Sequence, residues 1–273
     1  PFYSLNENKV VYLPYVLYRQ LYGSNGMCAG NTPEEAMVQG LSEIYERYVM
    51  KYILSHSITP PTIPEDEISS YVDIVDILNR IKKKGDYEIK IKDLSLNKGY
   101  PVVGTLIIDK NTGSFGFRIA SHPSLQVAIE RTLTEAMQGR TLQNFVGTTK
   151  IGTPQEAADQ SNIANIFKTG EGYFRAELFY NTPSYSHTLW KDVQGYENKN
   201  LLLNMVKPLI ESGYDILIRD RSITGFPSFH LIVPGISEMY DCSELRRKEL
   251  ITSKTVALRA THYNERNPED IKR

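Results

Sequence analysis

The sequence has few cysteines, almost no net charge and no long apolar run, and each scarcity excludes a class of protein. Its two cysteines, Cys28 and Cys242, lie far apart, without a CxxC pair or a metal-ligand spacing, so a disulfide framework is not expected. The 31 basic and 32 acidic residues give a formal charge of −1, which indicates neither a nucleic-acid nor a membrane partner. No apolar run approaches the ~20 residues of a membrane span, and no secretory signal opens the chain. We therefore expect a cytoplasmic protein.

What remains is the composition of an ordinary globular protein. The 273 residues are 41% hydrophobic and 23% charged, which is enough to build a sizeable core. Helical and strand patterns alternate without a low-complexity linker, an internal repeat or strict βαβ order. The sequence therefore predicts an α+β fold in one compact domain that spans residues 1–273.

Apolar periodicity and turn residues predict where the elements lie. Helices are expected at about residues 32–54, 66–84, 124–140, 155–167, 200–212 and 243–258. Strands are expected at about residues 9–18, 87–94, 101–109, 114–120, 214–219 and 228–233, with a hairpin turn at residues 111–113. Trp190 and most of the 18 tyrosines are expected to pack in the core or at its rim.

A Gly-rich stretch, residues 23–30, leads into the first long helix. Thr32 suits the N-cap, Pro33 suits the first helical position, and Glu35 completes a capping box. Glycines allow a ligand to approach the backbone closely, and a helix N-terminus attracts phosphate. The stretch matches neither the P-loop nor the dinucleotide-binding fingerprint, so any phosphate site here belongs to another class.

Three glutamates, which we call the acidic strip, share one face of that helix: Glu35, Glu43 and Glu46. At ~100° per residue they align with Gln39, with Arg47 at the margin. The roughly opposite stripe, expected to face the core, consists of Met37, Leu41, Ile44 and Tyr48. A solvated polar face is one interpretation, yet no basic residue between Gln20 and Glu46 balances the charge. The other interpretation is a Mg²⁺ site completed by substrate phosphates.

The helix predicted at residues 124–140 shows a similar division. Arg131, Glu135 and Gln138 line up at i, i+4 and i+7. Arg131 and Glu135 are either a surface ion pair of small energy or, with Arg131 as the key group, a phosphate clamp that uses the planar guanidinium fork. The predicted buried side consists of Leu125, Ala128, Ile129, Thr132 and Ala136.

Three blocks of sequence resemble the signature regions of the YcaO family. The first is Ser24–Ala36 with Gln39–Val49, which contains an ExxER motif; the second is Ala120–Pro123 with Ala128–Arg140; the third is Leu231–Tyr240. Their order and spacing follow the family over almost the whole chain. The resemblance implies an ATP site distinct from the known nucleotide folds, in which glutamates hold Mg²⁺ ions that bridge the phosphates.

Position by position, the resemblance assigns candidate site residues but no catalytic residue. Glu43 and Glu46 match metal-binding carboxylates. Asn31, Glu35, Arg47 and Arg131 match residues around the nucleotide. Cys28 joins these cofactor-binding candidates at a position where close relatives have a serine that contacts the nucleotide, so the side chain departs from the family pattern there.

The resemblance also implies a chemistry. Family members phosphorylate a backbone amide oxygen of a peptide or protein substrate, which makes the amide carbon electrophilic. The chain most resembles the stand-alone bacterial members, accessory factors for β-methylthiolation of ribosomal protein S12. That likeness implies a radical-SAM methylthiotransferase and ribosomal protein S12 as partners, with a homodimer as a candidate assembly. The alternatives are an azoline-, thioamide- or amidine-forming enzyme of ribosomal peptide natural-product biosynthesis, and a non-catalytic scaffold or leader-peptide-binding module.

Two departures from the family lead to further expectations. The family builds its metal site with an additional, earlier ExxER helix, and only one ExxER occurs here. The chain is therefore expected to be a partial domain that lacks its N-terminal portion and turns over ATP weakly or not at all. It also ends without the proline-rich tail of azoline-forming relatives, which favours the stand-alone type.

Two further groups of residues have open roles. His122 is expected to cap or pack rather than to touch a ligand. Arg219 and Arg221 belong to a solvated turn or contact the substrate, and the turn is the preferred interpretation.

Overall fold

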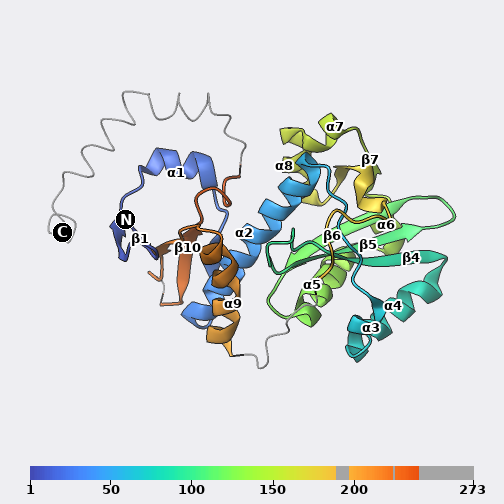
Figure 1. Cartoon of the computed structure of the whole chain (residues 1–273), viewed down its shortest axis with the longest axis horizontal. Coiled ribbons are helices and arrows are strands. Elements are labelled where there is room, and N and C mark those ends of the chain that lie inside the picture. The colour runs from blue at the N-terminus through green and yellow to red at the C-terminus, as the bar shows by residue number, and fades with distance from the viewer. Residues whose placement is uncertain (189–196, 224, 240–273) are drawn as a thin grey trace. The chain divides into compact units, whose positions relative to one another are not determined.

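The computed structural model describes residues 1–188, 197–223 and 225–239, which form two compact units (Figure 1). The first unit combines Pro1–Ile44 with the described part of Leu209–Arg273, and the second is Tyr45–Pro208. The sequence predicts one compact domain instead, because helices α2 (Pro33–Ser55) and α9 (Asn198–Glu211) run through the divisions without any linker. That the domain extends over residues 1–273 stays a prediction. The predicted helix at 243–258, Trp190 and Cys242 lie outside the described residues.

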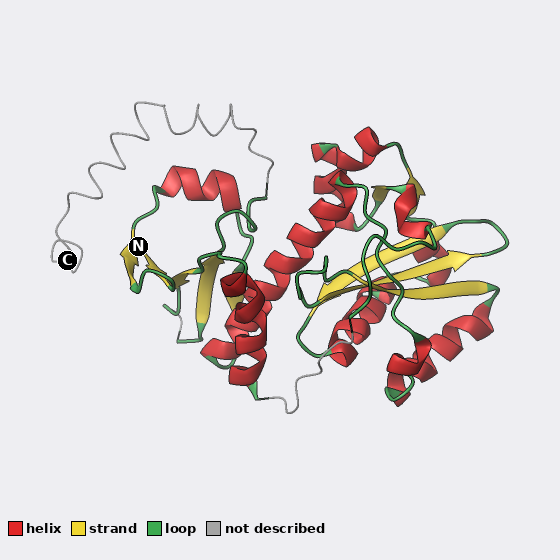
Figure 2. Ribbon diagram, viewed as in Figure 1, coloured by secondary structure: helices red, strands yellow, loops and turns green. Residues whose placement is uncertain are grey.

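Helices and mainly antiparallel strands build both units, which confirms the predicted α+β class (Figure 2). The first unit holds a five-stranded antiparallel sheet in the order β2-β1-β9-β10-β3. Its strands are β1 (Phe2–Ser4), β2 (Lys9–Val11), β3 (Met27–Ala29), β9 (Leu217–Asp220) and β10 (Ser228–Ile232). Helix α1 (Tyr15–Tyr22) contributes Tyr18 and Tyr22 to a core cluster with Phe2, Leu217 and Ile232.

The strand predicted at residues 9–18 is wrong beyond Val11. Pro14 has a φ of −57° and stands directly before the first residue of α1, Tyr15. Proline is compatible with a strand edge and with a helix start, because it lacks an N–H group and has a fixed φ. Burial decides between the two: Tyr18 and Tyr22, one helical turn apart, both pack into the core cluster.

The second unit holds the other five-stranded sheet, in the order β4-β5-β6-β7-β8. Its strands are β4 (Tyr87–Asp93), β5 (Val102–Asp109), β6 (Phe115–Ser121), β7 (Thr149–Ile151) and β8 (Gly172–Phe174). Strands β4 to β7 pair antiparallel and β7 pairs parallel with β8. The three long strands match the predicted ones within one or two residues, whereas the short β7 and β8 were not predicted.

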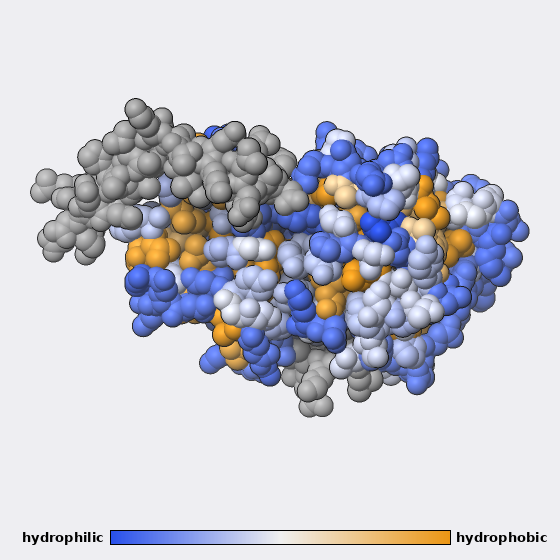
Figure 3. All heavy atoms as spheres, turned by 45° about the horizontal axis from the view of Figure 1, so that its top comes forward, coloured by the Kyte–Doolittle hydropathy of each residue, from blue (hydrophilic) through white to orange (hydrophobic). Residues whose placement is uncertain are grey.

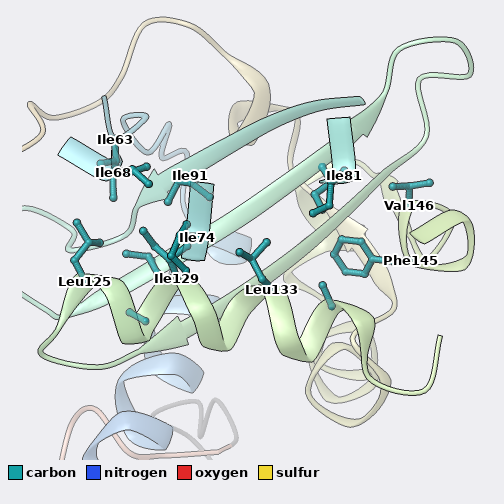
Figure 4. Close-up of a cluster of buried hydrophobic side chains, with 14 residues drawn as sticks. Ile63, Ile68, Ile74, Ile81, Ile91, Leu125, Ile129, Leu133, Phe145 and Val146 are labelled. Atoms are coloured by element: carbon teal, nitrogen blue, oxygen red, sulfur yellow. The ribbon is translucent and has the colours of Figure 1, made fainter. Parts of the chain in front are cut away.

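Helices α4 (Val72–Lys84) and α5 (Leu125–Met137) cover one face of this sheet. In Figure 4, Leu125, Ile129 and Leu133 project from α5 toward Ile74 of α4 and Ile91 of β4. The predicted buried side of α5 is confirmed, since all five of its residues are buried: Leu125, Ala128, Ile129, Thr132 and Ala136. This packing fixes the end of β6 and the start of α5, where the candidate site lies.

The remaining elements are short. They are α3 (Glu65–Ile68), α6 (Leu142–Val146), α7 (Pro154–Ala158), α8 (Gln160–Thr169) and the 3₁₀ helix η1 (Ala176–Phe179). Two predicted helices are therefore divided, into α3 and α4 and into α7 and α8. The second division falls at Asp159, whose carboxylate accepts hydrogen bonds from the backbone N–H groups of Ser161 and Asn162 and so begins a new helix.

The surface in Figure 3 shows hydrophobic residues in small groups separated by hydrophilic ones. Among the described residues, none of the helices has the length and apolarity needed to cross a membrane.

Candidate functional site

Helix α2 carries most of the predicted site residues and is the longest described helix, with 23 residues. The backbone N–H of Glu35 donates to Thr32 Oγ1 at 3.2 Å, as a capping box requires. The Glu35 carboxylate reaches back one residue further than predicted, because its Oε2 accepts from the backbone N–H (3.0 Å) and the Nδ2 (3.1 Å) of Asn31. The structure thus brings together Asn31 and Glu35, two of the predicted nucleotide-binding residues.

The acidic strip is half-buried, which does not fit a solvated polar face. Glu35, Glu43 and Glu46 are all of intermediate exposure. On the predicted core stripe, Leu41 and Ile44 are buried, but Met37 and Tyr48 are only partly so. Burial extends well beyond that stripe, to Ala36, Val38, Tyr45, Val49 and Met50. Carboxylates partly withdrawn from water need cations or hydrogen-bond donors near them. The chain supplies donors to two of the three, from Asn31 to Glu35 and from the N–H of Ser121 to Glu46, and the cation-binding interpretation stays a prediction.

Within the Gly-rich stretch, Gly26 is required by the protein's own packing. Gly26 has a φ of +78°, and a Cβ there would lie 2.3 Å from the carbonyl oxygen of Leu231. The backbone N–H of Leu231 also donates to the carbonyl of Gly26. Strand β10 therefore requires a glycine at this position, while the approach of a ligand to the Gly-rich stretch stays a prediction.

Cys28 lies on the edge strand β3 with its side chain against helix α2. Its Sγ donates to the carbonyl of Phe229 at 3.6 Å, and the absence of a side chain at Gly40 leaves room for the sulfur. Burial raises the pKa of the Cys28 thiol to about 11, and the charge of Glu43 acts in the same direction. Cys28 is therefore a neutral thiol near pH 7 and can offer a ligand only a weak hydrogen bond.

Ser121, the last residue of β6, holds two predicted site residues through its backbone. Its N–H donates to Glu46 Oε1 at 2.8 Å, and its carbonyl accepts from Arg131 Nη1 at 3.0 Å. Ser121 thus joins a predicted metal-binding carboxylate of α2 to a predicted phosphate-binding guanidinium of α5. Sequence reasoning missed Ser121 because its backbone N–H and carbonyl make both hydrogen bonds, and a pattern of side chains does not reveal backbone contacts.

The turn between Ser121 and α5 is stabilised by His122. This buried side chain accepts a hydrogen bond at Nδ1 from the backbone N–H of Ser124, at 3.0 Å. Because Ser124 is the N-cap of α5 and makes no side-chain cap bond itself, the predicted capping role of His122 is confirmed.

The electrostatics of α5 show that Arg131 acts on Glu135. Burial raises the pKa of the Glu135 carboxyl, while Arg131 and Arg118 oppose that rise. The contact that the structure gives for Arg131 is its hydrogen bond to the carbonyl of Ser121, and the ion pair with Glu135 stays a prediction. Arg47, the other arginine among the predicted site residues, lies over the ring of Phe167 on α8, with its guanidinium carbon 5.2 Å from the ring centre.

Arg219 is not part of a solvated turn. It lies in β9, with its guanidinium 5.8 Å from the ring centres of both Phe2 and Tyr18 and with Nη1 donating to the Tyr18 hydroxyl at 3.1 Å. The predicted turn is wrong for Arg219 because strand pairing with β10 extends through Asp220.

The donor set fits a magnesium ion shared with phosphates better than an ion held by protein alone. Within the described ranges, no three His, Cys, Asp or Glu side chains are placed to hold a metal. Glu43 and Glu46, however, are three residues apart on one continuous helix and therefore on neighbouring positions of one face. Mg²⁺ in proteins is commonly bound by one or two carboxylates together with water and substrate phosphates, so these two residues suit it.

Comparison with known proteins agrees with this chemistry. Residues 1–237 match the family model described as YcaO cyclodehydratase, ATP- and Mg²⁺-binding. The chain is 33% identical over 246 residues to the ribosomal protein S12 methylthiotransferase accessory factor YcaO of Escherichia coli, covering 90% of this chain and 42% of that protein. It is 32% identical over 248 residues to an uncharacterised protein of Haemophilus influenzae, covering 90% of this chain and 41% of that protein. The chain thus spans less than half the length of these relatives.

Solved structures share the fold. The heterocyclase TruD superposes with a TM-score of 0.60 at 22% identity, over 86% of this chain and 34% of that one. A heterocyclase in complex with substrate and cofactor gives a TM-score of 0.58, also at 22% identity, over 86% of this chain and 32% of that one. At this level of identity the likeness establishes the architecture.

Proposed function

The chain belongs to the YcaO family, whose members are described as cyclodehydratases that bind ATP and Mg²⁺, and from this premise we propose that it uses Mg²⁺ and ATP to activate amide groups of a peptide or protein substrate. The observation that carries the proposal is the joint attachment of Glu46 and Arg131 to Ser121. Phosphoryl transfer needs charge neutralisation and positioning more than covalent help from the protein, and a fixed carboxylate beside a fixed guanidinium offers both.

In this proposal each predicted residue has a defined task. Glu43 and Glu46 would hold Mg²⁺, and bound ATP would supply the phosphoryl group. Arg131 presents a planar fork suited to phosphate oxygens. The Asn31 and Glu35 pair at the start of α2 and Arg47 further along it would bind the remainder of the nucleotide, with Cys28 as a neutral neighbour. The half-burial of the glutamates strengthens their attraction for a cation, because water screens them less.

The proposed reaction has two steps. The amide oxygen of the substrate attacks the terminal phosphorus of ATP, and ADP leaves. A nucleophile then adds to the amide carbon, and the former amide oxygen departs as part of inorganic phosphate. Within this scheme we favour assistance to β-methylthiolation of ribosomal protein S12, since the E. coli accessory factor is 33% identical.

Two other functions remain alternatives. An azoline-, thioamide- or amidine-forming enzyme would use the same activation, and the heterocyclases show the same fold. A non-catalytic scaffold would keep the fold without any need for a half-buried acidic strip, and that strip is the feature that speaks against it.

An isotope experiment tests the amide activation directly. Ribosomal protein S12 with ¹⁸O in its backbone carbonyls would be mixed with the chain, ATP, Mg²⁺ and an external nucleophile such as hydroxylamine. Because this chain is expected to turn over ATP weakly at most, the readout is the isotope content of the phosphate and not its rate of release. We expect ¹⁸O in the phosphate that the wild-type chain releases and none with Glu46→Gln. Phosphate released without ¹⁸O would indicate simple ATP hydrolysis and contradict the proposal, whereas transfer from an unrelated peptide but not from S12 would favour the biosynthetic alternative.

A further inference from the structure

Two serines related to Glu46, one by helix spacing and one by a backbone hydrogen bond, have buried hydroxyl groups without a hydrogen-bond partner in the described structure. They are Ser121, which is fully buried, and Ser42, which is 2% exposed. A buried hydroxyl without a partner has lost its water and gained nothing in return, so such groups are uncommon in native proteins. Their occurrence at two positions related to one carboxylate points to a partner that arrives in another state of the site.

Ser42 is related to Glu46 by helix geometry. The two residues are four positions apart on α2 and therefore lie on the same face, one turn from each other. Side chains on a helix lean toward its N-terminus, so the side chain of Glu46 extends over the turn that contains Ser42. A serine inside a helix commonly donates to the carbonyl four residues earlier, but the Ser42 hydroxyl makes no such bond.

Ser121 is related to Glu46 by direct contact, because its backbone N–H donates to Glu46 Oε1 at 2.8 Å. Alternation along β6 places the Ser121 side chain on the face opposite to that of Ala120. Ala120 pairs with Val103, a member of the cluster packed under α5. The Ser121 hydroxyl therefore points away from that apolar cluster, and its backbone already holds Glu46.

We propose that Ser42 and Ser121 are positioning residues for Glu46: when the Glu46 carboxylate binds Mg²⁺, their hydroxyls donate hydrogen bonds to it and fix its orientation. This inference rests on the proposed function, because it assumes that Glu46 is a metal ligand. Carboxylates that bind metals are usually held by further hydrogen bonds, and removal of such a partner lowers metal affinity by about 10- to 100-fold. Complete burial suits this role, since the hydroxyls need to reach the carboxylate and not the ligand itself.

The test measures two properties of Ser42→Ala and Ser121→Ala. One is the affinity for Mg²⁺ at saturating ATP, from calorimetry, and the other is the unfolding midpoint without ligand. We expect the Mg²⁺ affinity of each variant to fall about 10-fold, with an unfolding midpoint equal to or above that of the wild type, because no existing hydrogen bond is lost. Ser121→Thr, which keeps the hydroxyl on a strand, should recover most of the Mg²⁺ affinity.

Ser237→Ala is the matched control. The Ser237 hydroxyl is also buried but is satisfied, because it accepts from the backbone N–H of Val233 at 2.9 Å and donates to its carbonyl at 3.0 Å. This variant should lose stability and keep its Mg²⁺ affinity, the opposite of the two test variants.

The outcomes separate this inference from the proposed function. Wild-type protein that binds Mg²⁺ and ATP, with both alanine variants binding as tightly, overturns the positioning role and leaves the proposed function standing. Alanine variants that are destabilised in the same way as Ser237→Ala also overturn it, since the hydroxyls would then be structural. Wild-type protein that binds no Mg²⁺ with ATP overturns both proposals.

Discussion

Glu46 and Arg131 are bound by the same residue, the carboxylate through the N–H of Ser121 and the guanidinium through its carbonyl. A hydrogen bond that involves a charged group is shorter and stronger than a neutral one. The end of β6 therefore fixes both groups at once, and α5 begins only four residues after Ser121. Ser121 thus brings together two residues that are far apart in the sequence.

The backbone N–H of Ser121 provides a first prediction about stability. Glu46→Gln loses the charge but keeps an oxygen that accepts from this N–H, so it should lower the free energy of unfolding by less than Glu46→Ala does. Glu46→Ala leaves the buried N–H without this acceptor, which costs about 1–3 kcal/mol. Denaturant unfolding of both variants checks the difference. Equal stabilities of the two variants would show that the contact carries no energy.

Gly170 provides a second prediction. It follows α8 with a φ of +74°, and a Cβ there would lie 1.7 Å from Arg118 Nη1, which donates to the Gly170 carbonyl at 2.9 Å. Gly170→Ala must therefore strain the backbone and displace Arg118. Gly113 is the control, since it has a φ of +72° and a Cβ added there would meet no atom within 4 Å. We expect Gly113→Ala to cost about 1 kcal/mol from backbone strain and Gly170→Ala to cost clearly more, as measured by thermal unfolding.

His187 provides a prediction about pH. Its Nε2 lies 2.7 Å from Glu67 Oε2 and its Nδ1 lies 2.8 Å from Asp93 Oδ2. Burial lowers the pKa of His187, but the hydrogen bonds and charges of the two carboxylates outweigh it and raise the pKa above its ordinary value. Protonated His187 donates to both carboxylates, and neutral His187 can donate to only one.

The direction in which pH changes the stability follows from this raised pKa of His187. The stabilisation by His187 is fully present below the unfolded value of about 6.5 and is lost as the pH rises through the folded value. The difference in unfolding free energy between wild type and His187→Gln should therefore be constant below about pH 6.5 and shrink as the pH rises above that value. A difference that stays constant at higher pH, or that grows with pH, would contradict the prediction.

The sequence predicted the parts of the fold that depend on local pattern. Helix α2 was predicted from Thr32, Pro33 and the apolar stripe after them, and strands β4 to β6 from short segments rich in β-branched and aromatic residues and bounded by turns. Helix α1 was missed because Pro14 is compatible with both a strand and a helix start. The division into two units was missed because α2 passes from Ile44 to Tyr45 without any break in its pattern.

In the candidate site, too, sequence patterns revealed local features and missed contacts between distant segments. Glu35, Glu43 and Glu46 could be found by helix projection because a helix places them on one face. Ser121 could not be found, since its role depends on backbone groups. The packing role of Gly26 could not be found either, because the atom that needs its space, the Leu231 carbonyl, is distant in sequence.

Calorimetry of Mg²⁺-dependent ATP binding tests the central claim most directly, using the wild-type chain, Glu43→Gln and Glu46→Gln. Both variants keep the shape of the side chain and remove its charge, so the fold should persist while the metal ligand weakens. We predict that the wild-type chain binds ATP more tightly with Mg²⁺ than without it, and that each variant loses at least about 10-fold of this Mg²⁺-dependent gain. ATP binding that is equally tight with and without Mg²⁺, or variants that retain the full gain, would contradict the assignment of α2 as the magnesium-binding helix.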